Sequence, residues 1–175
     1  MEEDSTRNIG LIGFMGTGKT TVGKALASST GRQFFDTDTL VEELAGKTIS
    51  QIFLTEGEES FRKIESRVVK EVCEHEAAVI SFGGGVVLST SNINTIRTSS
   101  IVVLLRATVE TILTRTASNH FRPLLNIGEN DVENRIRSML LQRRTFYETA
   151  MDYALDTDSL SIEEAVSRII GGLKL

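Results

Sequence analysis

The feature that most restricts the fold of this chain is the octapeptide GFMGTGKT at residues 13–20, which fits the pattern G-x-x-x-x-G-K-[ST]. It follows Asn8–Ile12, an apolar run that predicts a strand, and it opens Lys19–Ser29, an amphipathic run that predicts a helix. Glycines let backbone N–H groups turn inward around phosphate oxygens, and the helix N-terminus adds a favourable partial charge. A chance glycine-rich turn is the alternative, but the strand, the Lys-Thr pair and the helix together favour a phosphate-binding loop.

The residues of this loop have distinct expected roles in binding a nucleoside triphosphate. The Lys19 ammonium can reach the β- and γ-phosphates, and the Thr20 hydroxyl can ligate Mg²⁺. The residues that we expect to bind the nucleotide are Gly16, Thr17, Gly18, Lys19, Thr20 and Thr21. The predicted cofactors are therefore ATP and Mg²⁺, whereas the loop does not identify the acceptor of the phosphoryl group.

The rest of the chain alternates short apolar runs with longer amphipathic ones, which predicts an α/β fold with a parallel sheet. Further strands are expected at Gln33–Phe35, Ala77–Ser81, Ile101–Leu105 and near Tyr153–Leu155. Helices are expected at Thr39–Leu44, Glu58–Glu74, Val109–Ala117, Val132–Tyr147 and Ser161–Leu173. With 175 residues and no repeat or linker, the chain is expected to form one domain, residues 1–175.

Two segments outside this alternation are expected to border the site. Residues 37–74 contain no strand signal, so we interpret them as a helical insertion between the second and third strands. Residues 117–126 are polar and contain the only proline, Pro123, so we interpret them as a mobile lid between two helices. Closure of such a lid excludes water, which otherwise competes with the acceptor.

Composition narrows the choice of partners. The formal net charge of -5 disfavours nucleic acid as a binding partner. Because the chain as a whole is acidic, binding of an anionic substrate requires a local cluster of cationic side chains. No apolar run approaches the ~20 residues that span a bilayer. The N-terminal segment Met1–Arg7 lacks the features of a signal or transit peptide, and the lone cysteine, Cys73, fits reducing conditions. We expect a cytoplasmic monomer that contacts neither membrane nor nucleic acid.

An acidic pair, Asp36 and Asp38, follows the short strand Gln33–Phe35. Alternate residues of an extended segment face the same way, so both carboxylates can point at one site beside the phosphate loop. One can hold Mg²⁺ through a water, and the other can help to remove a proton from the attacking hydroxyl. The alternative is a helix N-cap, which is a common use of aspartate at a strand-to-helix junction. The neighbouring phosphate loop favours a functional role.

Five segments, in this order and spacing, resemble the shikimate kinase family. They are residues 13–21, FDTD at 35–38, EGE at 56–58 with FRKIE at 61–65, GGG at 83–85 and RPLL at 122–125. The resemblance covers roughly residues 8–170. It implies a three-layer α/β/α P-loop NTPase fold with a five-stranded parallel sheet in the order 2-3-1-4-5, a helical substrate-binding region at residues 37–74 and the lid.

The resemblance also implies an activity and residues for it. The reaction transfers the γ-phosphoryl group of ATP to the 3-hydroxyl of shikimate, in the pathway to chorismate and aromatic amino acids. Asp38, Lys19 and Arg122 are the implied catalytic residues, and Arg122 also reaches the nucleotide phosphates. The implied metal-facing residues are Thr20 and Asp36. Asp156–Ser159 resembles, by position only, the loop that closes over the adenine.

For shikimate itself, the resemblance implies that Arg62 grips the carboxylate and that Glu65 orients this arginine. A guanidinium suits this role because its fork matches a carboxylate bidentately. The implied substrate-binding residues are Asp38, Arg62, Glu65, Gly83, Gly84, Gly85 and Arg143. The chain departs from the family at residues 145–147, TFY in place of Pro-Leu-Tyr, which loses the proline's turn. The choice between Arg143 and Arg144 is therefore open.

Two rival functions remain. The first is another small-metabolite P-loop kinase, such as a gluconate or nucleoside monophosphate kinase, which shares the phosphate loop and the lid. Such kinases lack the FRKIE run together with the three glycines. The second is a nucleotide-binding module without catalysis, and the presence of Asp38, Lys19 and Arg122 opposes it.

Overall fold

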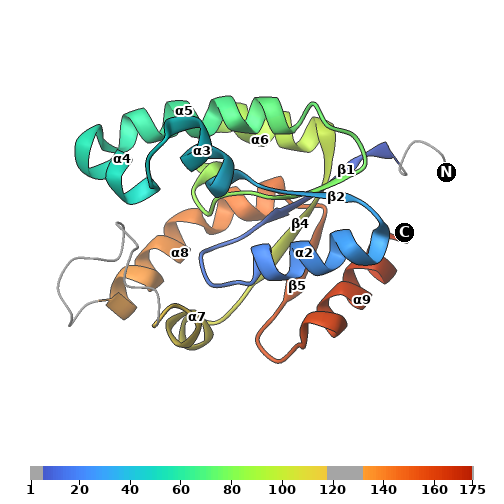
Figure 1. Ribbon diagram of the computed structural model, residues 1–175. Coiled ribbons are helices and arrows are strands. Elements are labelled where there is room, and N and C mark those ends of the chain that lie inside the picture. Colours follow the sequence, from blue (N-terminus) through green and yellow to red (C-terminus); the bar gives the residue numbers. More distant parts are fainter. Residues whose placement is uncertain (1–5, 118–131, 175) are drawn as a thin grey trace.

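The structure of the protein, a computed structural model, describes residues 6–117 and 132–174 and contains a five-stranded parallel sheet (Figure 1). The strands are β1 (Asn8–Ile12), β2 (Gln33–Asp36), β3 (Ala78–Ser81), β4 (Ser100–Arg106) and β5 (Tyr153–Asp156). Their order is β2-β3-β1-β4-β5, which confirms the order that the family resemblance implied. The central strand β1 pairs with β3 on one side and with β4 on the other, with Ile9 opposite both Val79 and Ile101.

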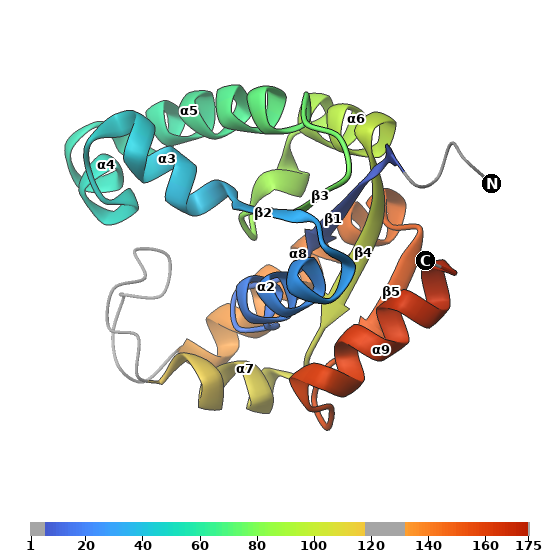
Figure 2. The same cartoon turned by 45° about the vertical axis from the view of Figure 1, so that its right-hand side comes forward.

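Helices cover both faces of the sheet, which confirms the three-layer α/β/α class. Helices α2 (Lys19–Thr30) and α9 (Ile162–Leu173) pack on the face that carries Ile9, Leu11 and Leu105. Parts of α5 (Gly57–Val72), α6 (Thr90–Ser99) and α8 (Val132–Ala150) pack on the opposite face. Figure 2 shows the sheet between these two layers. All five residues of β1 are buried, as expected for a strand covered on both sides.

Residues 37–74 contain three helices, where the sequence predicted a helical insertion. They are α3 (Thr37–Ala45), α4 (Ile49–Thr55) and α5. They enclose a small core of their own, built from Val41, Ile52, Phe61 and Val68. In Figure 1 these helices extend beyond the sheet on one side, where they form one wall of the site. The separate helix α4 was not predicted; Thr48 starts it with a capping box that includes Gln51.

Two further elements were not predicted, a short 3-10 helix η1 (Val86–Leu88) and α6. Helix α6 has the polar sequence TSNINTIRTS, in which only two side chains, Ile93 and Ile96, are buried and apolar. So few apolar positions give a weak helical period. The Ser89 side chain caps the helix by accepting a hydrogen bond from the Asn92 N–H.

Helices α7 (Val109–Thr116) and α8 are the elements on either side of residues 118–131. Most of the predicted lid at 117–126, including Arg122, lies outside the described residues. Helix α8 continues past Tyr147 to Ala150, so the chain does not turn at residues 145–147. A third apolar cluster joins Phe14 of the phosphate loop to Ile112 of α7 and Ile136 of α8.

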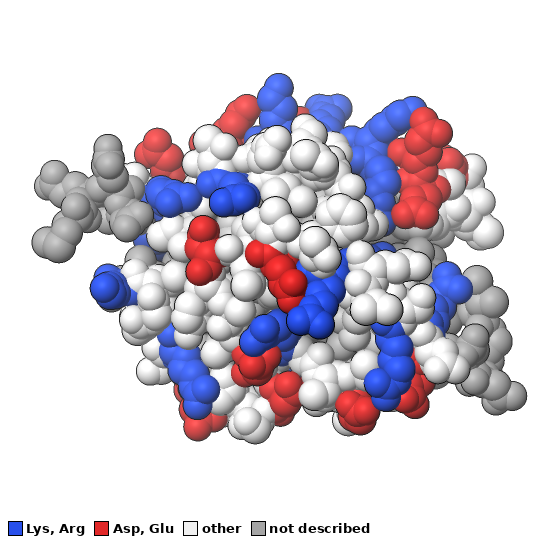
Figure 3. All heavy atoms as spheres, turned by 180° about the vertical axis from the view of Figure 1, so that it is seen from behind, with Lys and Arg blue, Asp and Glu red and all other residues white. Residues whose placement is uncertain are grey.

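Charges on the surface are mixed by sign. Figure 3 shows Lys and Arg side chains interspersed with Asp and Glu on the face opposite to the view of Figure 1. Many of these charges pair within one helix, for example Arg67 with Glu71 and Arg137 with Glu133. No helix within residues 6–117 and 132–174 combines the length and the apolar character needed to cross a bilayer.

Candidate active site

A cavity of about 1170 Å³ opens where the strands end at their carboxyl sides. The phosphate loop after β1, Asp38 after β2, the glycines after β3 and Thr157 after β5 all line it. Ligands of open parallel sheets bind in this place because the strand ends leave a crevice between the connecting segments. Phe61 and Arg62 of α5 and Arg143 of α8 complete one half of the cavity.

The phosphate loop is held in a shape that requires glycine. Gly13, Gly16 and Gly18 have φ angles of 145°, 77° and 95°, which side chains with a Cβ rarely adopt. A Cβ on Gly13 would also collide with the carbonyl oxygen of Leu105 in β4. The Thr17 hydroxyl donates to the Phe14 carbonyl at 2.8 Å, and Lys19 Nζ donates to the same oxygen at 3.0 Å. The ammonium of Lys19 thus lies beside the loop in which we expect the phosphates to bind.

The N-terminus of α2 is open toward the cavity. Gly18 is its N-cap residue and provides no side-chain cap, and the first turn carries no acidic residue. Thr17, Gly18, Lys19, Thr20 and Thr21 line the cavity at this point. N–H groups at such a helix start suit phosphate oxygens, because they are donors without intrahelical acceptors.

The two predicted metal-facing residues are in contact. The Thr20 hydroxyl donates to Asp36 Oδ2 at 2.7 Å, and Asp36 Oδ1 accepts from the backbone N–H of Asp38 at 3.0 Å. Asp36 is therefore the N-cap of α3, so the capping interpretation also holds for this residue. One carboxylate and one hydroxyl beside a phosphate loop fit Mg²⁺, which keeps several waters and takes substrate phosphates as ligands. Among the described residues, no group of three or more His, Cys, Asp or Glu side chains could hold a metal by itself.

Asp38 and Glu65 both lie against Gly83, in the glycine segment that follows β3. A Cβ built on Gly83 would lie 2.6 Å from Asp38 Oδ1 and 3.2 Å from Glu65 Oε1, so this position has no room for a side chain. The backbone N–H of Gly83 donates to the buried Thr37 hydroxyl at 2.9 Å. This bond fixes the glycine segment relative to the start of α3, which carries Asp38.

Arg62 and Glu65 form an ion pair at the edge of the cavity. Arg62 Nη1 lies 2.8 Å from Glu65 Oε2, and Arg62 Nη2 lies 3.0 Å from Glu58 Oε1. Glu65 is buried, and its Oε1 atom has no hydrogen-bond partner. Burial raises the pKa of Glu65, and the Arg62 charge opposes this effect without cancelling it. Glu65 therefore acts on the cavity through Arg62, since its own side chain is only 3% exposed.

The structure distinguishes Arg143 from Arg144. Arg143 is 7% exposed, lines the cavity and donates from Nη1 to the Gly84 carbonyl at 3.2 Å. Its guanidinium also lies 5.6 Å from the centre of the Phe14 ring. Arg144 is exposed on the other side of α8 and pairs with Glu148 at 2.8 Å. Successive residues of a helix point about 100° apart, so only one of the two can face the site.

Sequence reasoning missed Arg115, which lines the other end of the cavity. Its guanidinium donates to the Gly16 carbonyl at 3.3 Å, to the Thr157 hydroxyl at 3.0 Å and to the Thr157 carbonyl at 2.7 Å. The buried Thr157 hydroxyl is also 3.1 Å from the Thr17 carbonyl. An arginine in the amphipathic run VETILTRT gives no signal of this role. The only available signal was Thr157 itself, which directly follows a strand.

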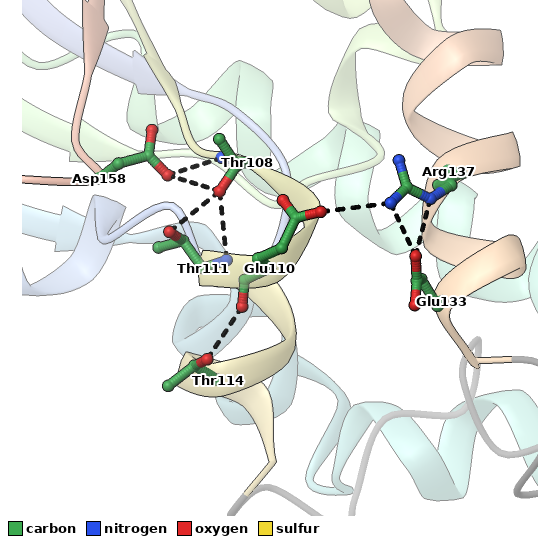
Figure 4. A network of polar contacts seen from close by, with 7 residues as sticks. All are labelled: Thr108, Glu110, Thr111, Thr114, Glu133, Arg137 and Asp158. Carbon is green, nitrogen blue, oxygen red and sulfur yellow. Dashed lines mark hydrogen bonds and ion pairs between the residues drawn. The ribbon is translucent and has the colours of Figure 1, made fainter.

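A polar network supports the helix that carries Arg115 (Figure 4). Asp158 accepts hydrogen bonds from the backbone and the hydroxyl of Thr108, at 2.8 and 2.9 Å, and Thr108 caps α7. Partial burial opposes ionisation of Asp158, but hydrogen bonds from Thr111 and Thr108 outweigh it and lower the pKa. At the other side of α7, Arg137 bridges Glu110 and Glu133. The start of α7 is thus attached to the segment after β5 and to α8.

Comparison with known proteins assigns this chain to a family. The family model described as shikimate kinase matches residues 15–174. The shikimate kinase of Caldanaerobacter subterraneus subsp. tengcongensis is 45% identical over 164 residues, which cover 94% of each chain. That of Pelotomaculum thermopropionicum is 41% identical over 168 residues and 96% of each chain.

The chain belongs to the shikimate kinase family.

Solved structures of the shikimate kinase family agree in fold. The enzyme of Acinetobacter baumannii in complex with shikimate has a TM-score of 0.94 and 35% identity, covering 99% of this chain and 96% of that one. The enzyme of Aquifex aeolicus has a TM-score of 0.79 and 33% identity, covering 95% and 96%. Shikimate kinase family members are ATP-dependent phosphotransferases with a P-loop, and this membership disfavours both rival functions.

Proposed function

We propose that this chain transfers the γ-phosphoryl group of ATP to the 3-hydroxyl of shikimate, giving ADP and shikimate 3-phosphate. The observation that carries the proposal is one cavity, in a chain of the shikimate kinase family, with a phosphate loop in one half and Asp38, Arg62 and Arg143 in the other. These two arginines are the local cations that a chain with a net charge of -5 requires for an anionic acceptor.

ATP binds along the phosphate loop in this proposal. The backbone N–H groups of residues 16–21 surround the phosphate oxygens, and Lys19 approaches the β- and γ-phosphates. Arg115 and Thr157 line the cavity next to the loop. In this proposal the nucleoside part of ATP binds at this end. Arg122, assigned from the sequence pattern alone, adds a second cation on the phosphates.

Thr20 and Asp36 are the proposed residues for Mg²⁺, since their oxygens lie side by side next to the loop. When bound, Mg²⁺ neutralises charge on the β- and γ-phosphate oxygens. The Thr20–Asp36 hydrogen bond orients both oxygens in advance, so that little rearrangement is needed for binding.

Shikimate binds in the other half of the cavity. Arg62 and Arg143 hold its carboxylate from opposite walls, and the backbone of residues 83–85 contacts the ring. Glu65 orients Arg62 through the ion pair between them. A Cβ on Gly85 would lie 2.5 Å from Arg62 Nη1, so glycine at this position leaves space for the guanidinium.

The chemical step depends on position and charge. Asp38 accepts the proton of the 3-hydroxyl, whose oxygen forms the new bond to the γ-phosphorus while the bond to the β-phosphate oxygen breaks. Lys19 and Arg122 stabilise the negative charge in transfer. The residues that line the cavity hold ATP and shikimate in one relative orientation. The reaction between them then proceeds within a single complex and needs no further encounter.

The test is ADP formation by the purified chain with Mg²⁺, with and without shikimate, and with gluconate or a nucleoside monophosphate as alternative acceptors. We expect shikimate-dependent ADP release, with the product identified by mass spectrometry as a monophosphate of shikimate. Arg62→Ala should weaken shikimate binding far more than ATP binding, because only the carboxylate partner is lost. Turnover with another acceptor and none with shikimate would reject the proposal.

We further propose a cytoplasmic monomer that forms one domain over residues 1–175. The monomer is supported by the make-up of the cavity, because the expected residues of both halves that fall within the described part of the chain line it without a second subunit. The location rests on the lone Cys73, which is buried and free. Sedimentation velocity at micromolar concentration tests the monomer, and a second species at twice the mass would contradict it.

A further inference from the structure

The phenol of Tyr147 has a role that the proposed reaction has not used. Tyr147 lies on α8 one turn after Arg143, and the two side chains share the face that is directed at the glycine segment. Tyr147 is 5% exposed, and its hydroxyl donates to the Gly84 carbonyl at 2.5 Å. Arg143 Nη1 donates to the same carbonyl oxygen at 3.2 Å. Two side chains from one helix thus converge on a single backbone atom.

The phenol also contacts the arginine. A hydrogen bond links Tyr147 and the Arg143 guanidinium, so phenol, guanidinium and Gly84 carbonyl form a closed triangle. Burial raises the pKa of Tyr147 to about 12, although the nearby Arg143 opposes this. The phenol therefore keeps its proton throughout the neutral range and remains a donor to Gly84.

Arg143 has few other constraints on its direction. It faces a cavity on one side and the Phe14 ring on the other, and an arginine side chain has many rotamers. A guanidinium binds a carboxylate bidentately only in one orientation. A neighbour that holds this orientation before the ligand arrives reduces the cost of ordering on binding.

We propose that Tyr147 is a positioning residue, whose hydroxyl holds the Arg143 guanidinium and the Gly84 backbone in the arrangement that receives the substrate carboxylate. The inference rests on the proposed function, because it assigns a carboxylate to Arg143. The Tyr147 ring has a separate role, since it packs in the core on the α6 and α8 face of the sheet. Ring and hydroxyl can therefore be tested independently.

Tyr147→Phe keeps the ring and removes the hydroxyl. We expect the KM for shikimate to rise about three- to tenfold, the range that one lost hydrogen bond gives. The KM for ATP should stay within about twofold, because the hydrogen bond of the phenol goes to Gly84 and not to a residue of the phosphate loop. The matched control is Tyr153→Phe, the other tyrosine of the chain, which lies on β5 against Gly172 and should change neither constant.

A readout specific to the carboxylate separates positioning from general structural damage. For the wild-type chain and for Tyr147→Phe, kcat/KM is measured with shikimate and with its methyl ester, which lacks the charge. We expect the preference for shikimate over the ester to fall about three- to tenfold in Tyr147→Phe. An equal fall for both compounds, with the preference unchanged, would overturn the inference.

A double-mutant cycle tests separately whether the Tyr147 hydroxyl acts through Arg143. If the hydroxyl acts through the guanidinium, Tyr147→Phe should have almost no further effect on the shikimate KM once Arg143→Ala is present. Additive effects would overturn the inference while leaving the proposed function intact. A wild-type chain that does not phosphorylate shikimate would instead reject the proposed function, and the inference with it.

Discussion

The two halves of the cavity are built on different principles. The nucleotide half is one contiguous loop, residues 13–21, whose shape depends on glycine conformations and whose donors are mainly backbone N–H groups. The acceptor half is built from side chains far apart in the chain, with Asp38 on α3, Arg62 on α5 and Arg143 on α8. The backbone site depends on the glycines that set its conformation, whereas the side-chain site depends on charged groups that several separate helices bring together.

The two halves also differ in the burial of their charged side chains. Glu65 and Arg143 of the acceptor half are buried although Asp38 is exposed, whereas Lys19 of the nucleotide half is half-buried. Charges taken out of water need partners, because an unpaired buried charge is strongly unfavourable. We therefore expect single substitutions in the acceptor half to affect one ligand sharply, and substitutions around the loop to affect the other ligand more moderately.

The largest effect is expected for Asp38→Asn, which removes the proton acceptor and keeps the shape. The kcat should fall about 100- to 10,000-fold, the usual contribution of a positioned general base. Both dissociation constants, measured by calorimetry, should change little. Asp152→Asn is the matched control, since Asp152 is exposed and directly precedes β5, at the end of this strand away from the cavity. Near-normal turnover of Asp38→Asn would remove this residue from the mechanism.

Arg143→Ala and Arg144→Ala form the next pair, since they are neighbours in sequence on different faces of α8. Loss of Arg143 should raise the KM for shikimate about 10- to 100-fold, as expected for a hydrogen-bonded charge pair of about 1.5–3 kcal/mol. The KM for ATP should be unchanged. Arg144→Ala removes only an exposed pair with Glu148 and should stay within about twofold. The reverse ranking would show that α8 presents the other arginine.

Thr157→Val tests the nucleotide half through a side chain that supports it. Valine keeps the shape but loses the hydrogen bonds of the hydroxyl with the Thr17 carbonyl and with Arg115 Nη1, whereas the backbone carbonyl still accepts from Arg115. We expect a three- to tenfold weaker affinity for ATP and a loss of about 1–2 kcal/mol in the free energy of unfolding. Urea unfolding and calorimetry measure both, with the exposed Thr149→Val as control. A larger effect on shikimate than on ATP would break the division into halves.

The smallest expected effect is the contribution of Glu65 to the pH dependence of the free energy of unfolding. Its pKa is raised above the ordinary value of 4.5, so the folded state holds this proton more tightly than the unfolded state. The contribution is present below pH 4.5 and is lost as the pH rises through the raised pKa. Relative to Glu65→Gln, the wild-type chain should therefore lose stability with rising pH in this window, as measured by urea unfolding. A difference that is constant with pH would contradict the raised pKa.

These differences also explain what the sequence could predict. The phosphate loop is a local pattern between a strand and a helix, so its position and conformation follow from neighbouring residues. Asp38 reaches the cavity because β2 ends at the same edge of the sheet as β1. The expected alternation within one extended segment does not hold, because α3 begins at Thr37 and Asp36 caps it. The strand order came from the family resemblance and is confirmed.

The remainder depends on packing that no local pattern contains. The choice of Arg143 over Arg144 is decided by the rotation of α8 against Phe14 and Gly84. The role of Arg115 depends on a threonine 42 residues later in the chain. Helix α6 was missed because tertiary contacts of two isoleucines, rather than a clear apolar period, hold it on the sheet. Arg122 lies outside the described residues, so its role stays a prediction.

The ion pairing of Arg62 has a consequence for how the acceptor is selected. Before any ligand arrives, the carboxylates of Glu58 and Glu65 already contact this guanidinium, and Asp38 adds a third acid close to Glu65. The positive charges of Arg62 and Arg143 are thus balanced by nearby carboxylates. We therefore expect this half of the cavity to exert little long-range electrostatic attraction on anions in general. Inorganic phosphate and other small anions are expected to bind weakly there. The affinity for the acceptor then depends on its shape and hydrogen bonds, and only slightly on ionic strength.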